Sequence, residues 1–280
     1  MGVLLALASA LSWGSADFLG GVQSRKLSSV AVALWSQLAG GLVLLAFLLL
    51  SRQELSAEGF AWGVAAGVGT GAALILFYRG LSGGAMAIVA PVSASAAAVP
   101  VVAALLGGDA PSALQFAGFA LCLAGAVTVS VPDRNGRTLS GRPLNAVGLG
   151  LAAALGFGLF YVFVDRGGQA GGSPLWVIGG ARAGSMATIL AVAAFSRSPL
   201  RASRGSLPVL VLTGMLDTGA NVLFAIAATK GDLSVVAVLG SLYPVTTVAL
   251  ATLVSREPLT PLRGLGGVVA LAGVAVLSAS

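Results

Sequence analysis

Four polar residues stand inside long apolar runs of this 280-residue sequence and are its first candidates for chemistry: Asp17, Arg182, Asp217 and Asn221. If these runs lie in a lipid bilayer, a charge near the bilayer centre is costly and needs a partner or a water-filled cavity. Such residues are therefore candidates for binding a substrate or for coupling its movement to that of an ion.

Asp217 and Asn221 are four residues apart, so both would lie on one face of a helix. One interpretation gives Asp217 a role in binding a substrate or a proton. The other is an ion pair between Asp217 and Arg182 that only holds neighbouring helices together.

Asp17 lies close to Trp13 and Phe18 and precedes the basic residues Arg25 and Lys26. It could exchange protons and so couple transport to a proton gradient. Alternatively, it could be the partner of a basic residue in an ion pair at the membrane interface.

Aromatic and proline residues also recur in the apolar runs. The aromatic residues at matching depths are Trp13, Tyr78, Tyr161 and Tyr243, with Phe77, Phe157 and Phe160. They could form an apolar wall around a substrate, or they could be ordinary membrane anchors and packing residues. The prolines are Pro91, Pro100 and Pro244, and they predict bends that are either gating hinges or static kinks.

Several other kinds of chemistry are excluded. The sequence has no histidine and a single cysteine, Cys122, so it cannot form an internal disulfide or a metal site built on these residues. It contains no nucleotide-binding G-x-x-x-x-G-K-[ST] motif and no G-x-S-x-G motif of a nucleophilic serine. We therefore expect neither an enzyme nor a protein with a cofactor.

The composition indicates an integral membrane protein. Hydrophobic residues make up 57% of the chain and charged residues 9%, whereas roughly a quarter of a typical soluble chain is charged. The net charge of +6 is scattered between apolar runs, so it does not indicate nucleic-acid binding. The first 22 residues lack the basic start of a signal peptide and are interpreted as a membrane-spanning helix.

Ten apolar segments are long enough to cross a bilayer as helices, which needs roughly 20 residues. They span residues 2–22, 29–50, 60–79, 84–106, 113–131, 145–165, 175–195, 207–229, 232–254 and 261–279. Unbroken apolar runs without alternation exclude a β-barrel. We therefore predict an all-α integral membrane protein.

The two halves of the chain repeat one another. Trp13-Gly14 is matched 144 residues later by Phe157-Gly158, and Ser51-Arg52 is matched 145 residues later by Ser196-Arg197, which aligns Gln37 with Arg182. Gln37 is interpreted as a residue that hydrogen-bonds a neighbouring helix. The fifth and tenth segments open alike, with the matches Asp109 to Glu257, Ser112 to Thr260, Gln115 to Arg263, Gly118 to Gly266 and Gly125 to Gly273, all 148 residues apart.

This duplication predicts two five-helix repeats, residues 1–131 and 145–280, joined by a loop at 132–144. Five spans are an odd number, so the two repeats must lie in the membrane with opposite orientations. Inverted repeats are typical of secondary transporters, whose halves can close on a central site from either side.

The chain resembles the drug/metabolite transporter superfamily, and within it the EamA-type transporters with ten helices. The resemblance rests on Ser12-Trp13-Gly14 with Asp17-Phe18, on the paired openings of the fifth and tenth segments, and on the three prolines. Asp109 and Arg263 depart from the Glu and Gln that are more usual in the family. The resemblance implies ten helices around a central cavity, alternating access, and export of amino acids, related metabolites or toxic compounds.

We therefore expect a multi-pass transporter of the plasma membrane, or inner membrane, that exports small metabolites and could be driven by protons. The alternatives are a passive facilitator or a lipid flippase, and more remotely an intramembrane enzyme. The expected partners are a small-molecule substrate and membrane lipid, with no nucleic acid, and the protein could be a monomer or a homodimer.

The side of the membrane on which the termini lie is left open, because two arguments conflict. One set of loops carries Arg25, Lys26, Arg79, Arg134, Arg137, Arg142, Arg197, Arg201, Arg204, Arg256 and Arg263, and the other carries Arg52, Arg166 and Lys230. Basic loops favour the cytoplasm, which would place both termini outside. The family resemblance implies that they lie inside.

Overall fold

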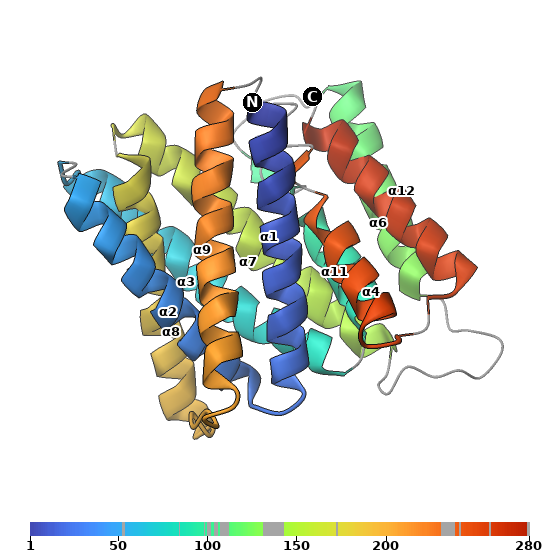
Figure 1. The fold of residues 1–280 in the computed structure, drawn as a ribbon. Coiled ribbons are helices and arrows are strands. Elements are labelled where there is room, and N and C mark those ends of the chain that lie inside the picture. Colours follow the sequence, from blue (N-terminus) through green and yellow to red (C-terminus); the bar gives the residue numbers. More distant parts are fainter. Residues whose placement is uncertain are drawn as a thin grey trace.

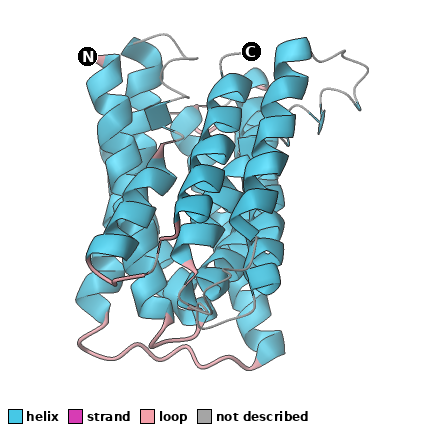
Figure 2. Ribbon diagram, turned by 90° about the vertical axis from the view of Figure 1, so that its right-hand side faces the viewer, coloured by secondary structure: helices cyan, strands magenta, loops and turns pink. Residues whose placement is uncertain are grey.

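The computed structural model describes residues 1–51, 54–83, 85–97, 99, 102–103, 106, 112–130, 143–171, 173–230, 239–240, 242–257 and 259–278. All regular structure in these residues is helical, and the helices form an antiparallel bundle (Figures 1 and 2). The two ends of the chain lie at the same end of the bundle (Figure 1), as an even number of spans requires.

The helices follow the predicted apolar segments closely. The first half contains α1 (Gly2–Ser24), α2 (Ser29–Ser51), α3 (Ala57–Ser82), α4 (Met86–Ser93), the 3₁₀ turn η1 (Ala94–Ala97) and α6 (Ala113–Ser130). The second half contains α7 (Pro143–Gln169), α8 (Pro174–Ser196), α9 (Leu207–Lys230), α11 (Tyr243–Leu253) and α12 (Pro261–Ser278). Six of the described helices are long and apolar enough to cross a membrane, and four shorter apolar helices accompany them. The prediction of an all-α membrane protein with ten helices is confirmed.

Local sequence explains where several helices begin and end. Ser56 caps α3, because its hydroxyl accepts a hydrogen bond from the amide of Gly59 at 3.1 Å. Ser112 and Gln115 cap α6 reciprocally, each side chain accepting a hydrogen bond from the other residue's amide. Helix α8 ends at Arg197, whose φ of 49° turns the chain into the left-handed conformation.

The predicted proline bends take different forms. Pro91 lies inside α4, and the helix gives way to the tighter 3₁₀ turn η1 three residues later. Pro244 lies in the first turn of α11, where its missing N–H removes no hydrogen bond from that helix. Pro100 lies outside the described residues.

Two pairs of glycine contacts show that the repeats are related by a two-fold operation. A Cβ atom on Gly67 of α3 would collide with the carbonyl of Ala181 and approach the amide of Ser185 in α8. A Cβ atom on Gly214 of α9 would meet the carbonyl of Ser36 and the amide of Gly40 in α2 in the same way. Because Ser36 and Ala181, like Gly40 and Ser185, are 145 residues apart, α3 packs on α8 as α9 packs on α2.

The helices α6 and α12 pack on each other across the same axis. A Cβ atom on Gly125 would meet Ala270, and one on Gly273 would meet Cys122. Cys122 and Ala270 are themselves repeat partners 148 residues apart, and the Cys122 thiol lies 3.7 Å from the carbonyl oxygen of Ala270. Such reciprocal contacts are the signature of a two-fold relation. Cys122 is buried in this contact, as expected of a small packing residue.

The helices at the centre of the bundle form two groups of three, and each group combines helices from both repeats. The first helix group is α1, α2 and α9, in which α9 packs on both α1 and α2. The second helix group is α7, α8 and α3, in which α3 packs on both α7 and α8. Each group therefore contains two helices of its own repeat and one helix of the other.

The glycine contacts predict opposite effects for two Gly→Ala substitutions. Nothing lies within 4 Å of a Cβ atom built on Gly41, so Gly41→Ala should leave the thermal midpoint of unfolding unchanged or raise it. Gly67→Ala should lower that midpoint by several degrees, because overpacking costs about 1–3 kcal/mol. The measurement is the thermal unfolding of both variants purified in the same detergent. Equal midpoints would contradict the close approach of α3 and α8.

Candidate functional site

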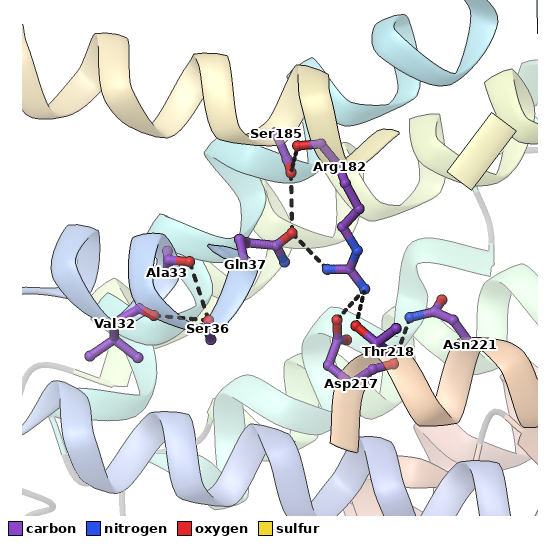
Figure 3. Close-up of polar contacts among 9 residues, drawn as sticks. All are labelled: Val32, Ala33, Ser36, Gln37, Arg182, Ser185, Asp217, Thr218 and Asn221. Atoms are coloured by element: carbon purple, nitrogen blue, oxygen red, sulfur yellow. Dashed lines mark hydrogen bonds and ion pairs between the residues drawn. The ribbon is translucent and has the colours of Figure 1, made fainter. Parts of the chain in front are cut away.

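Arg182 joins three helices near the middle of the bundle (Figure 3). It projects from α8, and one guanidinium nitrogen, Nη1, donates a hydrogen bond to the Oε1 atom of Gln37 in α2 at 2.6 Å. The other nitrogen, Nη2, donates to the Oδ2 atom of Asp217 in α9 at 2.6 Å. The ion pair that the sequence left as one of two interpretations of Asp217 is therefore present.

The remaining polar groups of this network are largely satisfied by one another. The amide oxygen of Gln37 also accepts a hydrogen bond from Ser185 at 3.2 Å, and both residues are buried. Asn221 donates to the backbone carbonyl of Asp217 at 2.7 Å, one turn away on its own helix. The side chains of Arg182 and Asp217 keep 13% and 28% of their surface exposed, so the ion pair is not sealed off completely.

Gln37 and Arg182 are repeat partners, and they bond directly to each other. Their separation of 145 residues is the offset between the repeats, so this hydrogen bond lies close to the two-fold axis. Two arginines at such a position would repel each other, whereas an amide oxygen is a good acceptor for a guanidinium. The duplicated positions have therefore diverged at the point where they meet.

Small residues let helices approach one another closely around this network. A Cβ atom on Gly40 would collide with the hydroxyl of Thr218, which lies next to Asp217. A Cβ atom on Gly71 of α3 would meet the backbone of Ser185, which lies one turn from Arg182. These contacts hold α2 against α9 and α3 against α8.

Asp17 lies at the centre of the inward face of α1. At 100° per residue, the same face carries Trp13 and Gly14 on one side of Asp17 and Gly20 on the other. Gly14 packs against the carbonyl of Tyr243 in α11, and Gly20 packs against the ring of Tyr78 in α3. The helix α1 is therefore held with Asp17 facing into the bundle.

Four groups from four helices lie close enough to Asp17 to interact with it electrostatically. They are Asp217 of α9, Tyr78 of α3, Tyr161 of α7 and Tyr243 of α11. Among the residues that the structure describes, no arginine or lysine forms an ion pair with Asp17. The alternative interpretation of Asp17 as a partner of Arg25 is not observed, because Arg25 pairs with Glu257.

The predicted aromatic residues surround this position unevenly. The ring of Trp13 lies 5.6 Å from that of Phe224 and 6.4 Å from that of Tyr243. Tyr243 lies near Ser93 of α4, while Tyr161 keeps 46% of its surface exposed.

Tyr78 and the remaining aromatic residues have a packing role in this arrangement. Tyr78 is buried, and its ring packs against Gly20 of α1. Phe77 stacks edge-on against Phe157 at 5.7 Å, which repeats the Trp13 contact with Phe224 in the other helix group. Phe160 lies 5.9 Å from Tyr161.

A second ion pair closes one end of the bundle, and the sequence did not predict its partners. Glu257, in the turn between α11 and α12, pairs with Arg25 after α1 and accepts a hydrogen bond from the amide of Met86 at 2.9 Å. This carboxylate, which the repeat pattern places just before α12, satisfies an amide in the first turn of α4. Burial raises the pKa of Glu257, and Arg25 and backbone amides offset part of that rise. The ion pair is therefore lost at a higher pH than an exposed glutamate would lose it.

Within the described part of the chain, no cluster of three or more acidic, histidine or cysteine side chains could hold a metal ion. The candidate site thus consists of the Arg182 network and Asp17 with its aromatic neighbours.

Comparison with known proteins places this arrangement in context. The model of the EamA-like transporter family matches residues 1–131 and 144–279. A search of curated proteins finds no match. A solved crystal structure with 18% sequence identity superposes with a TM-score of 0.64 over 98% of this chain and 95% of that chain, which shows a shared fold.

The Arg182 network predicts strong coupling between its two charges. Arg182→Gln and Asp217→Asn should each destabilise the protein by about 1–3 kcal/mol, less than for a fully buried pair because both side chains are partly exposed. The double variant should recover part of that loss, because no unpaired charge remains. Chemical denaturation of the four proteins in the same detergent measures the coupling. Strictly additive effects would show that the two side chains do not interact.

The Arg25 and Glu257 pair predicts a change in access to one end of the bundle. Ala85 is buried beside this pair, so a cysteine at Ala85→Cys, in a Cys122→Ala background, should react slowly with a membrane-impermeant maleimide. Adding Glu257→Gln should speed its labelling several-fold, because the neutral amide no longer holds Arg25.

The exposed position Arg204→Cys serves as the control at the same end, and its labelling rate should not respond to Glu257→Gln. Comparing intact with opened cells also shows which side of the membrane this end faces. An unchanged rate at Ala85→Cys would rule out the ion pair as a closure.

Proposed function

This chain belongs to the EamA-like transporter family, and from this premise we propose that it exports amino acids or related small metabolites by alternating access. The family assignment makes it a multi-pass membrane transporter. The substrate class, the direction, the plasma membrane as its location and a coupling to protons are the proposal.

The observation that carries the proposal is the ion pair between Arg182 and Asp217. It lies between the two helix groups, where inverted-repeat transporters bind their substrates. Both side chains keep part of their surface exposed although they lie in the middle of apolar helices. The exposed parts of both side chains leave their charged groups accessible to a ligand.

The network suits a substrate that carries both charges. A carboxylate can replace Asp217 on the guanidinium of Arg182, because arginine binds both in the same geometry. Asp217 would then be left without its cation, and a substrate ammonium group or a proton would restore the balance. This exchange of partners would link binding to a change in the contact between the helix groups.

Proton coupling requires a carboxylate that changes its protonation during the cycle. Asp217 loses its cation whenever Arg182 turns to a substrate, and Asp17 has no cationic partner among the described residues. Both are therefore placed to take up a proton when the central opening faces the more acidic side. An imposed proton gradient would then drive export.

Transport in liposomes tests this proposal. We expect purified protein to release part of a mixed pool of amino acids and related metabolites in a saturable manner, faster with a proton gradient imposed. Asp217→Asn should reduce the rate at least tenfold, because the charge that exchanges partners is lost. Glu58→Gln removes an exposed carboxylate at the start of α3 and should have no effect.

Two other outcomes would replace the proposal. Release that is saturable but indifferent to the gradient would identify a passive facilitator. If no metabolite leaves faster than from liposomes without protein, and labelled lipids cross instead, the protein would be a lipid flippase.

A further inference from the structure

We propose that Asp17 and the aromatic side chains around it bind a positively charged amine, so that the substrates of this transporter carry an ammonium group. This inference rests on the proposed transport function and specifies the chemistry of its central site. It assigns to Asp17 a direct contact with the substrate.

The first argument is the position of Asp17. Trp13, Asp17 and Gly20 follow one another along the inward face of α1, and Gly20 lets the ring of Tyr78 pack directly against the helix. On the other side, the carbonyl of Tyr243 packs on Gly14, and the hydroxyl of Thr247 donates to the Gly14 carbonyl at 3.2 Å. Asp17 thus lies along α1 between Trp13 and Tyr243 on one side and Tyr78 on the other.

The second argument is the balance of charge. Arg182 is shared between Asp217 and Gln37, which use both of its terminal nitrogens. Asp17 lies within electrostatic range of Asp217, and no described basic residue pairs with it. In the described residues the central site therefore holds one more acid than it holds bases. A cation of the substrate would remove this excess.

The third argument is the kind of residue that surrounds the carboxylate. Trp13, Tyr161 and Tyr243 come from three different helices, and the rings of Trp13 and Tyr243 lie 6.4 Å apart. Aromatic faces attract organic cations, and the attraction grows when water is excluded. Tyrosine hydroxyls can also accept hydrogen bonds from an ammonium group. Tyr161 keeps 46% of its surface exposed, so its ring is accessible to a ligand.

These features favour a cationic ligand over an anionic one. An anion would have to displace Asp217 from Arg182 and would still face two carboxylates, Asp17 and Asp217. A neutral apolar ligand would be drawn to the aromatic rings but would leave Asp17 unpaired. A protonated amine can interact with the aromatic rings through its positive charge and can pair with the carboxylate of Asp17.

Direct binding to the full-length protein in nanodiscs tests the inference. The probes are phenethylamine, which is a cation at neutral pH, its uncharged counterpart 2-phenylethanol, and the permanent cation benzyltrimethylammonium. Isothermal titration calorimetry should show that the two cations bind at least tenfold more tightly than the alcohol. This comparison uses only the unaltered protein, so it does not depend on the folding of a variant.

Variants then assign the preference to the proposed residues. Asp17→Asn should abolish the difference in affinity between the amine and the alcohol, and Asp17→Glu should retain it. Trp13→Leu should lower the affinity for both cations several-fold. Glu58→Gln, which removes an exposed carboxylate, should match the unaltered protein. Equal affinities for amine and alcohol, or cation binding that survives Asp17→Asn, would overturn the inference.

The pH dependence of cation binding supplies a further test. The groups within electrostatic range of Asp17 are Asp217, Tyr78, Tyr161 and Tyr243, from α9, α3, α7 and α11, and of these four only Asp217 is a carboxylate. Binding of benzyltrimethylammonium should weaken at low pH in the unaltered protein and become insensitive to pH in Asp17→Asn. If Asp17→Asn removes only the response of transport to a proton gradient and leaves cation binding intact, Asp17 is a proton site and the inference fails.

Binding and transport can fail separately. Export of acidic or uncharged metabolites alone would overturn the amine inference and leave the transport function intact. Amine binding without any transport would overturn the proposed function.

Discussion

A charge inside a bilayer needs a partner within the protein or a water-filled cavity, and the arrangement of this bundle's centre follows from how Arg182 meets that requirement. Its two partners come from α2 and α9, so three helices have to converge within hydrogen-bonding distance. Lipid offers no hydrophobic force that would press helices together, so close approach depends on small residues. Gly40 and Gly214 supply that approach between α2 and α9 by leaving no side chain between the backbones. The polar network therefore depends on the glycine contacts that allow the helices to approach one another.

The duplication kept the packing and changed the chemistry. Glycine contacts recur at equivalent positions of the two repeats. Gly67 and Gly214 make equivalent contacts, and so do Gly14 and Gly158. The polar positions do not recur, because Gln37 is matched by Arg182, and Asp17 by Tyr161, which lies 144 residues later. A symmetric fold lets the two helix groups exchange roles during alternating access. A ligand has no such symmetry, so the divergence at these two positions is consistent with the ligand site proposed above.

The sequence predicted the helices well because their signals are local. Apolar runs of sufficient length fix the helices, and the constant offset between the halves fixes their inverted relation. The ion pair of Arg182 with Asp217 was foreseen as an alternative, since two opposite charges in lipid have few other ways to be stabilised. The partners of Glu257 were not foreseen, because they lie 232 and 171 residues away and depend on how α1, α4 and α11 meet. The surroundings of Asp17 were missed for the same reason. They come from α3, α7, α9 and α11, and only the register of those helices brings their side chains to one place.

The division into helix groups gives the central ion pair a mechanical meaning. Arg182 belongs to α8 in the second helix group, while Gln37 and Asp217 belong to α2 and α9 in the first. If the two groups tilt apart on one side of the membrane, the bonds of Arg182 cross the moving boundary and are stretched or broken. The Trp13 contact with Phe224 and the Phe77 contact with Phe157 each lie within one group and can travel with it. Separation would leave Arg182 and Asp217 without partners in a medium of low polarity, which is costly. A substrate that presents its own charges between them lowers that cost, so the ion pair would both hold the resting bundle together and make its opening depend on the substrate.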